Sequence, residues 1–178
     1  MSKKRRERNI RGSSRAQDKW IAYILLILLV LVLERCVFNR LPLRSAVPQL
    51  LPLLTAAIGF FEGSAPGGWL GLGAGFLSSL LTGQTALLWF CPLLSIYCGS
   101  TRNKALGRTF FGYLLCAVGG MLLLEAGEIL WRYLFLDWEL ASLLSVALAE
   151  GGYSLLFVPV WYLLCWQIND RIPGELRV

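Results

Sequence analysis

The stretch that decides the fold is residues 67–81, GGWLGLGAGFLSSLL, in which a small residue returns at every fourth position. Positions i and i+4 lie on the same face of a helix, so the small residues form one stripe among bulky apolar ones. The stripe consists of Gly67, Gly71, Gly75 and Ser79. Such stripes let two helix backbones approach closely in lipid. The neighbouring helix belongs either to this chain or to a partner, and the pattern leaves both alternatives open.

The composition of the whole chain is typical of a membrane protein. The 178 residues are 56% hydrophobic and 16% charged, whereas a soluble domain carries about 25% charged residues. The apolar residues come in long blocks with the charges between them, as expected when lipid surrounds the apolar faces. We therefore predict an all-α, polytopic membrane protein.

Six apolar segments can be drawn, and together they make one membrane domain at residues 20–168. They cover residues 20–38, 43–61, 69–81, 85–99 and 109–131 and a last segment that ends at Trp166. The third and fourth are shorter than the 20 or so residues that cross a bilayer. They form either a tight hairpin through LTGQT (81–85) or helices that extend into the flanking glycine-rich sequence. The fifth repeats the small-residue spacing with Gly112 and Gly120.

Basic residues predict the orientation of the chain. Residues 1–19 carry eight Lys and Arg against two acids, which accounts for the net charge of +6. This tail, expected to be disordered, is typical of a segment held in the cytoplasm beside anionic lipid. Nothing accompanies it that would read nucleic acid. Six spans also leave the tail at 169–178 in the cytoplasm, in agreement with the positive-inside rule, whereas five spans would fit that rule less well.

Two glutamates interrupt the fifth segment. Glu125 and Glu128 precede Arg132, and the Glu128–Arg132 spacing suits a helical ion pair. A span of about 20 residues from Thr109 ends near Glu128, so these residues mark either the helix end among headgroups or a polar site.

Glu150 lies in the last segment at a depth that depends on where the span begins. A start at Leu140 places it near the middle of the membrane, where a carboxylate is a functional candidate. We favour a start near Ala147, which leaves residues 139–146 at the outer interface, with Gly151–Gly152 as a hinge.

No chemistry-bearing constellation is recognisable. The five cysteines are scattered singly through apolar runs and the chain has no histidine, which argues against a disulfide framework or a zinc site. The sequence contains no nucleophile–base pair and no phosphate-cradling loop, so we expect a protein that is not an enzyme and holds no metal or cofactor.

Three stretches resemble the bacterial rod shape-determining protein MreD family. They are the proline-led PQLLPLLTAAIGFFEG (48–63), the glycine-rich GWLGLGAGFLSSLLTG (68–83) and AEGGYSLLFVPVWYLLCWQINDR (149–171). The resemblance covers residues 43–108 and 147–171. Where that family often has an aspartate after its Gly-Leu-Leu, this chain reads Ser79-Leu80-Leu81-Thr82, so a role that depends on the carboxylate is not carried over.

The resemblance implies a non-enzymatic scaffold of the cell-elongation machinery in the bacterial inner membrane. Its expected partners are MreC and, through the complex, MreB and the wall-synthesis enzymes, with the glycine face or the Glu125/Glu128/Arg132 edge as the contact. The alternative is a substrate-binding subunit of an energy-coupling-factor vitamin transporter, which has a similar size and number of spans. In that case the acids and nearby aromatic residues would line a ligand cavity.

Overall fold

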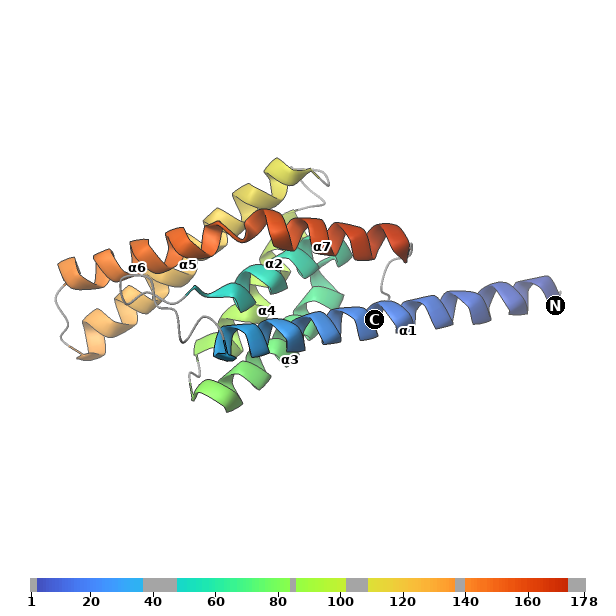
Figure 1. Cartoon of the computed structure of the whole chain (residues 1–178), viewed down its shortest axis with the longest axis horizontal. Helices are drawn as coiled ribbons and strands as arrows, with labels where there is room; N and C mark the ends of the chain where they lie inside the picture. The colour runs from blue at the N-terminus through green and yellow to red at the C-terminus, as the bar shows by residue number, and fades with distance from the viewer. Residues whose placement is uncertain (1–2, 37–47, 84–85, 102–108, 137–139, 173–178) are drawn as a thin grey trace.

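The computed structural model describes residues 3–36, 48–83, 86–101, 109–136 and 140–172, and all of its regular structure in these ranges is helical (Figure 1). The helices are α1 (Lys3–Cys36), α2 (Leu50–Glu62), α3 (Ser64–Thr82), α4 (Ala86–Thr101), α5 (Phe110–Leu136), α6 (Leu140–Leu155) and α7 (Val158–Arg171). The all-helical fold predicted from the sequence is confirmed for this part of the chain.

The basic tail differs from the expectation. Residues 3–19 are helical. They form the first half of α1, which continues without a break to Cys36. In Figure 1 this half projects beyond the other helices. The proposed boundary between residues 19 and 20 therefore falls inside one helix, and Lys19 itself is buried.

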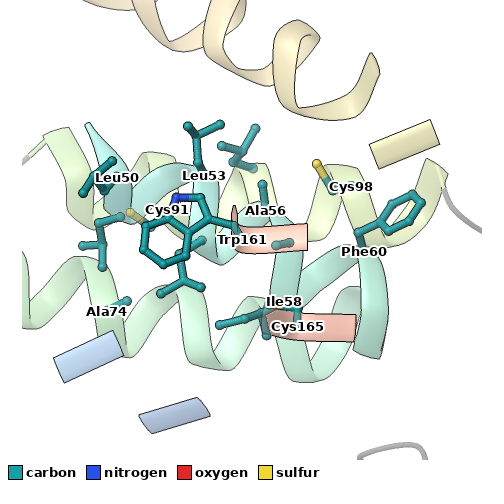
Figure 2. Close-up of a cluster of buried hydrophobic side chains, with 14 of the residues drawn as sticks. Leu50, Leu53, Ala56, Ile58, Phe60, Ala74, Cys91, Cys98, Trp161 and Cys165 are labelled. Carbon is teal, nitrogen blue, oxygen red and sulfur yellow. The ribbon is translucent and has the colours of Figure 1, made fainter. Parts of the chain in front are cut away.

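Helix α2 occupies the centre of the bundle. Every one of its 13 residues is buried, although a helix at a surface buries only one face. Side chains from α1, α3, α4, α5 and α7 complete the core around it, and part of this core is drawn in Figure 2. The labelled contributions are Leu50, Leu53, Ala56, Ile58 and Phe60 from α2, Ala74 from α3, Cys91 and Cys98 from α4, and Trp161 and Cys165 from α7.

The glycine stripe of α3 lies against α4 within the same chain. A Cβ added to Gly71 would meet the carbonyl oxygen of Cys91 at 2.8 Å, and one added to Gly75 would meet the backbone of Leu87. Numbers rise along α3 as they fall along α4, so the two helices are antiparallel. Of the two alternatives for this face, the structure has the internal one, because the backbone of α4 fills the space that a partner would need.

The four-residue spacing of glycines continues from α3 back to Gly59 of α2, across a tight turn. Gly63, with φ of 100°, joins α2 to α3 directly, a backbone conformation that glycine adopts without steric cost. The turn brings Gly67 against the Cα of Gly59, where an added Cβ would stand 2.5 Å away. Helix α3 thus begins at Ser64, five residues before the apolar segment drawn from the sequence, as the alternative of extension into the glycine-rich flank predicted.

The remaining small residues have separate environments. Gly120 of α5 packs against the side chain of Leu94 on α4. Gly112 is buried in the first turn of α5 and donates its N–H to the Thr109 hydroxyl at 3.2 Å. Ser79 is half-buried near the end of α3, where its carbonyl accepts the N–H of Gly83.

The last apolar segment is broken at a different place from the one predicted. Gly151 and Gly152 lie inside α6, and the interruption comes at Leu156–Phe157, just before Pro159 in the first turn of α7. The expected glycine hinge is wrong. A proline has no N–H to continue the preceding helix and its ring disfavours a helical residue before it, whereas glycine is tolerated within a helix at modest cost.

Two helical stretches in the described residues are long and apolar enough to cross a membrane, residues 110–127 and 144–171. Helix α1 adds an outward face of large apolar side chains beyond Lys19. These are Ile21, Ile24, Leu25, Leu28, Leu29 and Val32, each more than 40% exposed. Exposed apolar surface of this extent is normal against lipid and unusual against water.

Alanine substitutions on α3 test the packing of the glycine face. In Gly75→Ala the added methyl group meets the backbone of Leu87, so we expect the free energy of unfolding to fall by about 1–3 kcal/mol. The matched control is Gly73→Ala, whose methyl group meets no atom within 4 Å and which should be neutral or slightly stabilising. Unfolding of the purified protein in detergent measures both, and equal losses would refute the assignment of this face.

Candidate functional site

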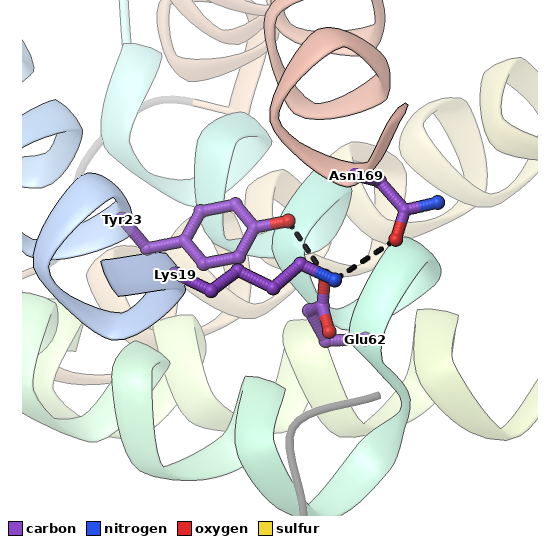
Figure 3. A network of polar contacts seen from close by, with 4 residues as sticks. All are labelled: Lys19, Tyr23, Glu62 and Asn169. Carbon is purple, nitrogen blue, oxygen red and sulfur yellow. Dashed lines mark hydrogen bonds and ion pairs between the residues drawn. The ribbon is translucent and has the colours of Figure 1, made fainter. Parts of the chain in front are cut away.

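The deepest polar cluster joins α1, α2 and α7 (Figure 3). The ammonium of Lys19 lies 2.7 Å from a carboxylate oxygen of Glu62, and each side chain is only 1% exposed. Charged side chains are almost never buried this completely unless they are paired. The pair closes the end of the bundle at which α1 enters it and α2 ends.

Two neutral side chains complete the cluster. Tyr23, one turn after Lys19, donates its hydroxyl to Glu62 at 2.8 Å. Lys19 also donates to the side-chain oxygen of Asn169 on α7 at 2.9 Å. An ion pair in a low-dielectric interior holds its place only when further hydrogen bonds satisfy the remaining donors and acceptors. Tyr23 and Asn169 supply such bonds.

The opposite end of α2 is also held by α1. The carboxylate of Glu34 accepts the backbone N–H groups of Leu50 and Leu51 at 2.6 and 2.8 Å. Helix α6 contributes the hydroxyl of Ser154, which accepts the N–H of Gln49 at 2.8 Å. Pro52, next in line, has no N–H. The N–H groups that the start of a helix leaves without an intrahelical partner are thus accounted for from Gln49 to Pro52.

These two contacts show that α1 and α2 run antiparallel. They also show that the charged side chains of α1 are opposite in sign to the ends of α2 that they face. A helix is positive at its N-terminus and negative at its C-terminus. Helix α1 places the Glu34 carboxylate at the positive end of α2 and the Lys19 ammonium at the negative end. We call this arrangement the two-ended clamp: Lys19, Tyr23, Glu62 and Asn169 at one end, and Glu34 and Ser154 at the other.

Aromatic rings pack beside the Lys19 end of the clamp. Tyr162 of α7 lies within 5.8 Å, between ring centroids, of Phe61, Phe110 and Tyr113. The hydroxyl of Tyr113 donates to the carbonyl oxygen of Leu53 at 3.0 Å. Helices α2, α5 and α7 therefore meet through aromatic rings, and the buried hydroxyl of Tyr113 has the hydrogen-bond partner that such a group requires.

The acids singled out in the sequence lie elsewhere. Glu125 is buried on α5 and its carboxylate faces α6, 3.9 Å from where a Cβ on Gly151 would stand. Glu150 is half-buried on α6 and its backbone carbonyl accepts the hydroxyl of Ser154. The Glu125 carboxylate therefore lies close to α6 at Gly151, the residue that follows Glu150. The side chains of Glu128 and Arg132 lie outside the described residues, so their expected ion pair stays a prediction.

The clamp was not found from the sequence. From the sequence, Lys19 belongs to the basic tail, and no role is predicted for Glu34 or Glu62. One local signal was present, since Lys19 and Tyr23 are spaced i, i+4 and so share a helix face. Glu62 and Asn169 follow 43 and 150 residues after Lys19, and no periodicity links such distant positions.

No group of three or more metal-ligating side chains occurs within the described ranges. No protein-family model, curated protein or solved structure matches the chain.

Methionine substitutions test the ion pair. Lys19→Met removes the ammonium that neutralises Glu62, and Glu62→Met removes its counterpart, so each should lower the free energy of unfolding by about 3–5 kcal/mol. The double variant should lose less than the sum of the two, because it leaves neither charge buried. Asp18→Asn, at an exposed neighbour of Lys19, is the control. Additive losses in detergent unfolding would show that the two charges do not interact.

The other end of the clamp has its own test. Glu34→Ala removes the acceptor of two N–H groups of α2, so the free energy of unfolding should fall by about 1–3 kcal/mol. Hydrogen exchange should rise at Leu50 and Leu51 and stay unchanged at Phe60 and Phe61, at the far end of the same helix. Arg35→Ala is the matched control, and protection that is retained at Leu50 would contradict the capping role.

Proposed function

We propose that this protein crosses the bacterial inner membrane six times with both ends in the cytoplasm. The alternating directions of the helices support the proposal. Lys19 on α1, Glu62 on α2 and Asn169 on α7 meet at one end of the bundle, which is the end with the basic tail. Glu34 on α1 and Ser154 on α6 meet α2 at the other. With α6 and α7 taken as one pass, the helices turn back five times.

Within that membrane we propose a non-enzymatic scaffold of the cell-elongation machinery, similar to MreD. The three stretches that resemble the MreD family correspond to α2, to α3 and to α6–α7. These helices surround or form the buried core. The stretches are thus the parts of the chain that determine how the bundle packs, as expected if the family shares an architecture and not a reaction.

The observation that carries the scaffold proposal is the use of buried charge in the clamp. Ionisable groups inside a membrane protein often mark a transport path. Here Lys19 and Glu62 bind each other, and Glu34 caps α2. All three side chains therefore hold α1 against α2. This structural use of buried charge supports a scaffold and not a transport path.

The partner contact falls on the far end of α5 in this proposal. Because α4 covers the glycine face of Gly67, Gly71 and Gly75, the remaining candidate is the edge with Glu125, Glu128 and Arg132. We propose MreC as the direct partner and MreB and the wall-synthesis enzymes as partners through the complex. Membrane lipid surrounds the rest, and neither a cofactor nor nucleic acid is needed.

Co-purification with an MreC-type protein from the same cells tests the proposal. The tagged protein should recover that partner, and Glu128→Gln/Arg132→Gln should reduce recovery about tenfold, equivalent to about 1.4 kcal/mol of binding. The matched control is Asp170→Asn/Arg171→Gln, an exposed charged pair at the opposite end of the bundle. Both variants must keep the thermal stability of the wild type.

The same purified protein also tests the alternative, a substrate-binding subunit of a vitamin transporter. If the tagged protein recovers no MreC-type partner and a panel of water-soluble vitamins raises its melting temperature at nanomolar concentrations, the scaffold proposal is wrong. Recovery of the partner with no shift across the panel supports the scaffold.

A further inference from the structure

Two cysteines that are distant in the sequence face each other across the α4–α5 contact. On α4, Phe90 and Leu94 lie against positions 127 and 120 of α5, so the helices are antiparallel. Continuing this register by one turn along each helix brings Cys98 of α4 to Cys116 of α5. Both residues are buried, and their thiol groups lie close enough to interact with each other.

The backbones are close at this point because glycine lies in the contact. Gly120 has the Leu94 side chain where a Cβ would be, and Gly119 has the Tyr97 hydroxyl 3.7 Å from that position. Disulfides need Cα atoms about 4.4–6.8 Å apart, and helices whose contact lacks side-chain bulk approach most closely. The thiols are therefore held together by the packing of the helices on either side of them.

We propose that Cys98 and Cys116 form a redox-sensitive thiol pair that a small apolar disulfide, RSSR, oxidises to an interhelical disulfide. One cysteine thiolate attacks a sulfur of RSSR, which forms a mixed disulfide and releases RS⁻. The second cysteine, after giving its proton to RS⁻, attacks the mixed disulfide and releases the second RS⁻, which takes up the first cysteine's proton. Two S–H bonds of the protein are lost, one S–S bond forms, and the two electrons reduce RSSR to two RSH.

Oxidation locks α5 to α4. Helix α5 also packs against α6, so the disulfide would restrain the α5–α6 pair against the core made by α2, α3 and α4. In the reduced state the same contact depends on the packing of the two helices. The pair is independent of the proposed scaffold function, since its chemistry needs only the α4–α5 register.

The test uses the full chain in lipid nanodiscs and the apolar oxidant 2,2′-dithiodipyridine. Cys36→Ser/Cys91→Ala/Cys165→Ala keeps only Cys98 and Cys116. We expect it to release two thiopyridones, lose two hydrogen atoms in mass and retain no thiopyridyl adduct. The matched control, Cys36→Ser/Cys98→Ala/Cys116→Ala, keeps Cys91 and Cys165, which are equally buried but drawn well apart in Figure 2. It should stay reduced or carry one adduct per thiol.

Peptide mapping of the oxidised wild type provides the second measurement if a variant fails to fold. A linked Cys98–Cys116 peptide that dithiothreitol releases supports the proposal, as does slower hydrogen exchange along α5 in the oxidised protein. Adducts on both cysteines, or two thiols that remain free for alkylation after denaturation, would overturn it.

Discussion

The structure depends on the complete burial of one short helix. All 13 residues of α2 are inside the bundle, so neither water nor lipid headgroups can satisfy its ends. An unpaired backbone group in such a place costs several kcal/mol. Helix α1 offsets part of that cost, because Glu34 accepts two N–H groups at the start of α2. At the other end of α2, Lys19 of α1 neutralises the buried Glu62 carboxylate. Ser154 of α6 accepts one more N–H group, that of Gln49 at the start of α2, and Asn169 of α7 accepts a hydrogen bond from Lys19.

With α2 fixed, the other helices pack by two different means. Helix α3 contacts α2 and α4 through glycine, which lets the helix backbones approach closely. Helices α5 and α7 meet α2 through tyrosine and phenylalanine rings, and the Tyr113 hydroxyl donates to the backbone of α2. The core is therefore close-packed on the α3–α4 side and aromatic on the α5–α7 side, and the Cys98–Cys116 pair lies where α4 meets α5.

Local features predicted much of this arrangement. The apolar blocks predicted helices throughout, and the four-residue spacing of Gly67, Gly71 and Gly75 identified the closely packed face of α3. Features that depend on a competition between local effects were less accessible. The apparent hinge at Gly151–Gly152 lost to Pro159, because helical hydrogen bonds tolerate glycine better than proline. The charge of the tail suggested disorder, whereas the helix of the first apolar segment extends back through it to Lys3.

By itself the sequence determined that the chain is helical, which residues are apolar and which helix face is small, since these properties follow from neighbours within one or two turns. Only the tertiary structure decided what covers each face. Lipid and the apolar surface of another helix look alike to a hydrophobic residue, so a hydropathy pattern does not distinguish burial in protein from exposure to the bilayer. The partners of Lys19 and Cys98 were also undetermined by the sequence. Each interaction joins separate helices, and its geometry exists only once those helices have packed.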